Sequence, residues 1–244
     1  MANKPRLTKA YTLGFAAVIT MVCSVLLASA ATLLREKQDQ NIQLDIKYNI
    51  LSVLGLVENR DIAPEKLLSL YTERVTTFVV DLEGKTVSGR KAEDIDPKSD
   101  PGLLPIFASI QGAEISAYCL PTQGKALWST VKGYIAFEKD LKTVKGISFY
   151  SHGETPGLGG EIDKAWFTEA FKGKSILNNE SELVSIQIVK GKMRDDEKDP
   201  QHKVDGISGA TLTGKVLPPS SKLHWRNMNL TSRQCEGRHH EYNK

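Results

Sequence analysis

The sequence predicts an α+β fold, with one N-terminal transmembrane helix followed by a domain of a mainly antiparallel sheet and flanking helices. Three observations support this prediction. An uncharged run extends from Ala10 to Leu34, short runs of apolar and β-branched residues follow it, and glycine-rich loops separate those runs. Consecutive strands with few helices between them favour α+β over an alternating α/β arrangement.

The uncharged run is the first predicted element. About 25 residues at about 1.5 Å per residue give roughly 37 Å, which exceeds a hydrocarbon core of about 30 Å. Lys4, Arg6 and Lys9 precede the run. The positive-inside rule therefore predicts a cytoplasmic N-terminus at residues 1–9, a transmembrane helix at residues 10–34 and an extracytoplasmic remainder.

A cleaved signal peptide is the alternative interpretation of this run, because Ala28-Ser29-Ala30 fits a cleavage site. Against cleavage, the uncharged run continues through Leu34. Apolar residues then recur four positions apart, at Ile42, Ile46, Ile50 and Leu54. This spacing predicts that a retained anchor continues directly into a further helical segment.

The next elements alternate between helix and strand. A second helix is predicted after Asp61, which offers an N-cap, with Pro64 in its first turn. A turn at Glu83-Gly84 separates a strand from a short, weaker partner near Thr86. Strands are predicted at residues 77–82, 115–120, 131–137 and 144–151, and residues 89–101 are predicted to form an exposed loop.

Two elements complete the predicted domain. A short helix is expected at about residues 164–172, with Gly173 as its C-terminal stop. The alternation of Val184, Ile186 and Ile188 predicts a half-buried strand after it.

Composition and charge exclude some partners. A net charge of +3 over 244 residues is too small for the dense basic face of a nucleic-acid binder, so no nucleic acid is expected. The acidic run at residues 195–199 is typical of a solvated loop, and Cys235, His239 and His240 make a poor ligand set. No metal site is predicted.

Two glycine-rich segments are the candidates for ligand binding. Residues 152–160 contain four glycines, which let a backbone approach a flat ligand closely, although a plain connecting loop has the same composition. Residues 205–211 place a threonine hydroxyl after two small residues, where backbone amides can hold a phosphate. Taken alone, Ser-Gly-Ala-Thr is also an ordinary turn sequence.

The order of several segments behind the anchor resembles that in the C subunits of the sodium-translocating NADH:quinone oxidoreductases. These segments are residues 47–51, residues 127–130 with Gly133-Tyr134, residues 152–160 and residues 205–211. The resemblance implies an exported FMN-binding domain at residues 35–213, anchored in a bacterial inner membrane. It also implies an electron-transfer role beside sister subunits and the membrane lipid, in a sodium-pumping complex.

The same resemblance implies the site residues. Thr211 would receive FMN from FAD through a phosphoester, with the help of a flavin transferase, and no catalytic residue is expected. Asp205 would serve either the flavin or the transferase, and Trp128 would belong either to the pocket or to the core. Ser208, Gly209 and Ala210 would line the attachment loop, and Glu154, Thr155, Leu158 and Gly159 would lie near the flavin ring.

The resemblance ends after Thr213, because residues 214–244 form a polar, basic tail in place of a closing apolar helix. This tail is predicted to be disordered. Two other functions stay open from the sequence. One is the FMN subunit of a ferredoxin:NAD oxidoreductase complex, and the other is an anchored extracytoplasmic sensor or binding module without redox activity.

Overall fold

The structure is a computed structural model that describes residues 8–95, 99–112, 114–126, 128–180, 182–184 and 186–210. The chain divides into two compact units, with the boundary between Leu44 and Asp45. The predicted attachment residue Thr211, Leu127 and the tail at residues 214–244 lie outside the described residues.

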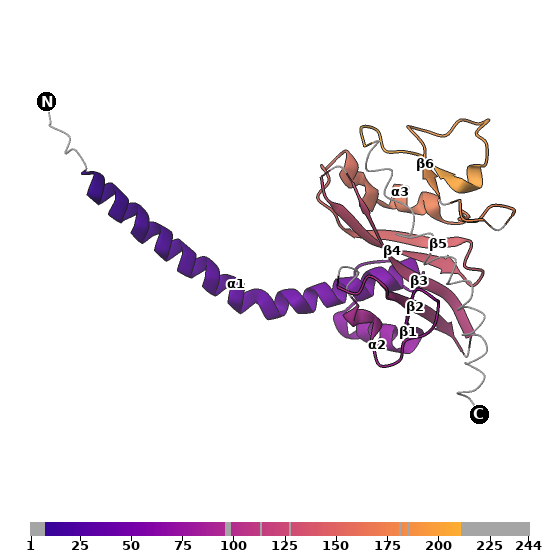
Figure 1. The fold of residues 1–244 in the computed structure, drawn as a ribbon, viewed down its shortest axis with the longest axis horizontal. Coiled ribbons are helices and arrows are strands. Elements are labelled where there is room, and N and C mark those ends of the chain that lie inside the picture. The colour runs from indigo at the N-terminus through magenta and orange to yellow at the C-terminus, as the bar shows by residue number, and fades with distance from the viewer. Residues whose placement is uncertain are drawn as a thin grey trace. The chain divides into compact units, whose positions relative to one another are not determined.

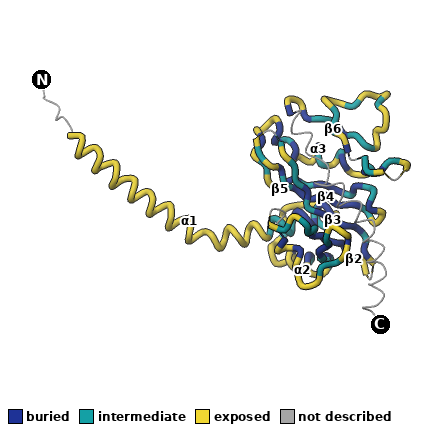
Figure 2. The backbone as a smooth tube through the Cα atoms, in the orientation of Figure 1, coloured by how far each residue is buried: buried dark blue, intermediate teal, exposed yellow. Residues whose placement is uncertain are grey.

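One helix, α1 (Lys9–Val53), contains the whole uncharged run and continues beyond it. This confirms the prediction that the run passes directly into a further helical segment. Residues 8–43 are exposed, as Figure 2 shows by the yellow colour of this part of α1. The helix is long and apolar enough to cross a membrane, a test that an N-terminal signal sequence also passes.

The second helix, α2 (Pro64–Arg74), begins at the predicted proline. The prediction that Asp61 caps it is wrong, because Ala63 occupies the N-cap and makes no side-chain capping bond. Pro64 already fixes its own φ near the helical value and brings no N–H that needs a partner. The helix therefore begins three residues after Asp61, beyond the reach of that carboxylate.

Five strands form one antiparallel sheet, and neighbours in the chain are neighbours in the sheet (Figure 1). An isolated antiparallel bridge between Val80 and Thr86 confirms the short partner that was predicted near Thr86. The strands are β1 (Val75–Val80), β2 (Leu104–Gln111), β3 (Glu114–Lys125), β4 (Thr130–Glu138) and β5 (Val144–Ser151). The predicted segments correspond to β1, β3, β4 and β5, whereas β2 was missed.

One face of the sheet carries the larger apolar core. Phe167 and Phe171 pack onto this face, with their ring centroids 5.3 Å apart. They come from α3 (Ala165–Thr168) and the 3-10 turn η3 (Glu169–Phe171), which follow each other directly and occupy the position of the predicted short helix. Gly173 follows with φ 75° and ends this segment as expected.

The opposite face packs against the end of α1. The Val53 carbonyl lies so close to Gly146 of β5 that an added Cβ would approach it to 2.7 Å. Asn49 is buried, and its Oδ1 accepts a hydrogen bond of 3.1 Å from Ser148. Cys119 is a free, buried thiol, and burial raises its pKa.

A second, two-stranded sheet is formed by residues that precede Thr211 in the chain. In it, β6 (Gln187–Ile188) pairs in parallel with β7 (Lys203–Val204). The predicted strand through Val184 and Ile186 is therefore wrong in length, because the partner strand offers only two residues. The remaining elements are the 3-10 turns η1 (Ala92–Asp94), η2 (Gly159–Asp163) and η4 (Pro200–His202).

Candidate functional site

The glycine-rich loop at residues 152–160 folds into a compact turn around Thr155. The carbonyl of Thr155 accepts hydrogen bonds from the amides of Leu158, at 3.1 Å, and Gly160, at 3.0 Å. Gly157 supplies the positive φ of 75° that this reversal requires. The turn presents Leu158 with 44% of its surface exposed, on a segment whose following glycines are buried.

Two loops are joined where this segment begins. The Oε1 atom of Glu154 accepts hydrogen bonds from the amides of Trp128, at 3.0 Å, and Ser129, at 3.3 Å. In return, the amide of Gly153 donates to Oγ of Ser129 at 2.6 Å. Glu154 is only 6% exposed. These contacts fix residues 128–129 beside the start of the glycine-rich loop.

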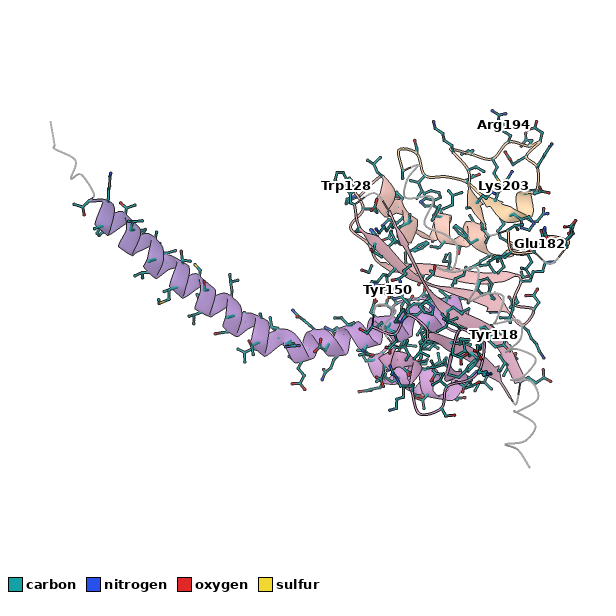
Figure 3. All side chains as sticks on the ribbon, in the orientation of Figure 1. Tyr118, Trp128, Tyr150, Glu182, Arg194 and Lys203 are labelled. Carbon is teal, nitrogen blue, oxygen red and sulfur yellow. The ribbon has the colours of Figure 1, made fainter. Side chains whose placement is uncertain are left out.

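The Trp128 side chain lies at the edge of the domain (Figure 3) and is 71% exposed. Of the two positions predicted for it, pocket or core, the core is therefore wrong. The preceding β-strand ends at Lys125, and Glu154 holds the backbone amide of Trp128 without burying the indole. The indole face is free to contact a ligand.

Two hydrogen bonds hold residues 205–206, in the segment before Thr211, against residues 191–193. Oδ1 of Asp205 accepts a hydrogen bond of 2.8 Å from the amide of Met193, and the amide of Gly206 donates to the carbonyl of Gly191 at 2.7 Å. A side chain at Gly206 would collide with the carbonyl of Val189, so only glycine fits there. The sequence did not predict this support, although Gly191 among charged residues is a turn signal.

Residues 207–210 form a turn with two buried ends and an exposed middle. Ile207 and Ala210 are buried in the core cluster, and the amide of Ala210 donates to the carbonyl of Ile207 at 3.1 Å. Ser208 and Gly209 lie between them and are exposed. The chain therefore enters Thr211 from an anchored position and presents small residues to solvent beside it.

The two glycine-rich segments meet at Leu158 and Gly209. Gly209 has φ 76°, and a Cβ added to it would lie 2.8 Å from Cδ2 of Leu158. The two segments are thus in contact, and Glu154 joins residues 128–129 to the first of them. No group of three or more His, Cys, Asp or Glu side chains in the described part of the chain is placed to hold a metal ion.

This arrangement suits a flat ligand that carries a phosphate. Gly206 and Gly209 let the turn pack closely against Val189 and Leu158, and the turn exposes Ser208 and Gly209. Such small-residue turns let backbone amides approach a phosphate. Leu158 and Trp128 supply exposed apolar surface suited to a flat ring.

Comparison with known proteins identifies the family. A family model described as an FMN-binding domain matches residues 127–217, which include every predicted site residue. The C subunit of the Na(+)-translocating NADH-quinone reductase of Pseudomonas aeruginosa is 36% identical, and the match covers 88% of this chain and 90% of that protein. The chain belongs to this family of C subunits.

Further members of the family agree with this assignment. The C subunit from Haemophilus ducreyi is 34% identical, and the match covers 89% of this chain and 90% of that protein. The crystal structure of the C subunit from Parabacteroides distasonis superimposes with a TM-score of 0.65 at 30% identity, covering 82% of this chain and 96% of that chain. The α+β fold predicted from the sequence is thereby confirmed.

Proposed function

We propose that this chain is the electron-transfer C subunit of a sodium-translocating NADH:quinone reductase, with FMN joined through its phosphate to Thr211. The contact between Leu158 and Gly209 is the observation that best supports the proposal. It brings the glycine-rich loop to within two residues of the proposed attachment point.

The proposed attachment is a phosphoryl transfer. The Thr211 hydroxyl oxygen forms a bond to the FMN phosphorus of FAD, the bond from that phosphorus to the AMP oxygen breaks, and AMP leaves. The hydroxyl proton passes to solvent or to a base of the flavin transferase. Turns rich in small residues suit such a step, because they let an outside enzyme reach the hydroxyl.

The chain's own residues bind and orient the cofactor. Ser208 and Gly209 leave space for the phosphate, Leu158 and Trp128 offer apolar surface to the ring, and Thr155 and Gly159 shape the loop that presents Leu158. When bound, FMN supplies a ring that accepts and donates electrons. The covalent link prevents its loss on the far side of the membrane.

The proposed setting is a bacterial inner membrane, with the N-terminus in the cytoplasm and the FMN-binding domain on the other side. Lys4, Arg6 and Lys9 before the apolar run support this orientation. Sister subunits and membrane lipid are the proposed permanent partners. N-terminal sequencing of the mature membrane protein tests the retained anchor, and a mature start at Ala31 would contradict it.

Flavin attachment is tested by producing the chain with and without a flavin transferase. We expect fluorescence that survives denaturing electrophoresis, and a matching gain in intact mass, only with the transferase. Thr211→Ala should abolish both signals. Thr213→Ala is the matched control and should leave both unchanged.

Thr211→Ser refines this test. It keeps the hydroxyl but loses the methyl group that restricts χ1, so partial labelling is expected if rotamer positioning matters. Mass spectrometry of tryptic peptides that places the flavin on Ser208 or Thr213 in the unmutated protein would contradict the assignment to Thr211.

A further inference from the structure

We propose that Glu154 and Ser129 form a reciprocal clasp that holds Trp128 as one wall of the flavin site, so that Glu154 acts on the flavin through Trp128. This inference rests on the proposed function and adds a positioning role to it. The clasp consists of the three hydrogen bonds that join residues 128–129 to residues 153–154.

Each of the two segments in the clasp donates backbone amide hydrogen bonds to a side chain of the other. The Glu154 carboxylate accepts the two consecutive amides of Trp128 and Ser129, at 3.0 and 3.3 Å, and the Ser129 hydroxyl accepts the Gly153 amide at 2.6 Å. The two segments are also packed tightly. A Cβ on Gly153 would lie 3.1 Å from Cβ of Ser129, so neither segment can shift without breaking a bond.

The exposed fractions of Glu154 and Trp128 are opposite to those usual for a carboxylate and a tryptophan. The ionisable Glu154 is 6% exposed, whereas Trp128 is 71% exposed. A buried carboxylate is costly without hydrogen-bond donors, and an exposed tryptophan forgoes the stabilisation of burial. Oε1 of Glu154 accepts two backbone amides, which places the carboxylate where it can position residues 128 and 129.

Trp128 is the most exposed large apolar residue in the described part of the domain. The other exposed residues of this kind in the domain are Leu68, Leu82, Leu158 and Trp166. Of these, Leu158 lies against Gly209 in the attachment segment. The clasp joins Trp128 to the same loop that carries Leu158. The two exposed apolar side chains are suited to contact a flat ring, and the flavin ring is the proposed ligand.

The first part of the test uses the full chain in detergent before flavin is attached. Hydrogen exchange is measured at the amides of Trp128 and Ser129. Glu154→Ala should speed exchange about fivefold to tenfold, the effect of losing one typical hydrogen bond. Glu154→Gln retains an acceptor oxygen and should restore most of the protection. Unchanged exchange in Glu154→Ala would disprove the clasp.

The second part uses the flavin-loaded chain and a double-mutant cycle. Glu154→Ala should shift the flavin absorption and reduction potential in the wild-type background but not in the Trp128→Ala background, which has no aromatic side chain for the clasp to position. An equal shift in both backgrounds would show that Glu154 acts on the ring directly, which overturns the positioning role. Ser129→Ala, which breaks the returning bond, replaces Glu154→Ala if that variant does not fold.

The two proposals fail in different ways. A wild-type chain that takes up no flavin at Thr211 contradicts the proposed function, and the flavin wall is then refuted as well. Exchange at Trp128 and Ser129 still reports on the clasp in that case. A labelled chain with an unprotected Trp128 amide contradicts the clasp alone.

Discussion

Leu158 lies against Gly209, so closely that a Cβ at Gly209 would lie 2.8 Å from its Cδ2 atom and would displace the Leu158 side chain. Gly209 also has φ 76°, a conformation that costs other residues roughly 1–2 kcal/mol. Gly209→Ala therefore combines strain with a clash and should strongly reduce flavin attachment, measured as fluorescence per mole of protein.

Gly157→Ala is the matched control for this variant. Gly157 has φ 75°, but an added Cβ would meet no atom within 4 Å, so the change introduces strain without a clash. It should retain most of the labelling. Adding Leu158→Ala to Gly209→Ala should restore part of the signal, and equal labelling of both single variants would contradict the importance of the contact.

Asp205 has a structural role that the motif alone does not reveal. Its Oδ1 accepts the Met193 amide at 2.8 Å. Asp205→Ala leaves that amide without its partner and should destabilise the domain by about 1 kcal/mol, measured by urea unfolding in detergent. Asp205→Asn retains an oxygen acceptor and should be close to wild type in stability.

The same pair of variants separates a role of Asp205 in the modification step from its structural role at Met193. If the carboxylate charge serves the transferase, Asp205→Asn should be stable but poorly labelled. If its role is to support the loop at Met193, Asp205→Asn should be labelled normally. Loss of labelling without loss of stability would therefore assign the charge to the modification step.

The turn between β4 and β5 should make stability depend on pH. Burial raises the pKa of Asp140, but hydrogen bonds from Thr143 and Lys142 outweigh it, and the pKa lies below its ordinary value of 3.8. A depressed folded-state pKa contributes stability above pH 3.8, which is lost as pH falls through the folded-state value.

Asp140→Ala should therefore be less stable than wild type at pH 7, and this difference should shrink as the pH falls below about 4. Asp140→Asn keeps an oxygen acceptor for the amides of Lys142 and Thr143, and its stability should lie between those of Asp140→Ala and the wild type. Urea unfolding at a series of pH values measures the effect, and a difference that stays constant down to pH 2 would contradict it.

The junction between α1 and the sheet leaves no room at Gly146. A Cβ there would lie 2.7 Å from the Val53 carbonyl, a backbone atom that cannot rotate away. Gly146→Ala should destabilise the domain by about 1–3 kcal/mol. At Gly102 an added Cβ meets only ordinary contacts of 3.8 Å, so Gly102→Ala is the control and should leave the urea midpoint nearly unchanged.

Strands with a clear boundary were predictable from the sequence, and β5 matches its predicted range of residues 144–151. β2 was missed because it contains Pro105 and lies between two neighbours, so its residues 105–109 are buried without alternation. Periodicity of two identifies strands with one exposed face, and it gives no signal when both faces are covered.

The site was predictable only in part, for a similar reason. The glycine-rich segments could be found in the sequence, but their contact at Leu158 and Gly209 joins residues about 50 positions apart, and no local pattern encodes it. The hydrogen bonds of Glu154 likewise run to residues 128–129. A carboxylate near glycines suggests a ligand, whereas its actual partners are backbone amides of a distant turn.

The order of the strands has a consequence for folding. β1 to β5 are neighbours in both chain and sheet, and the three pairings from β2 to β5 close short loops and lose little chain entropy. The ladder of β6 and β7 has only two residue pairs and cannot persist without the surface beneath it. The segment before Thr211 thus acquires its native shape late, and a transferase that recognises this shape would modify only chains whose main sheet is already complete.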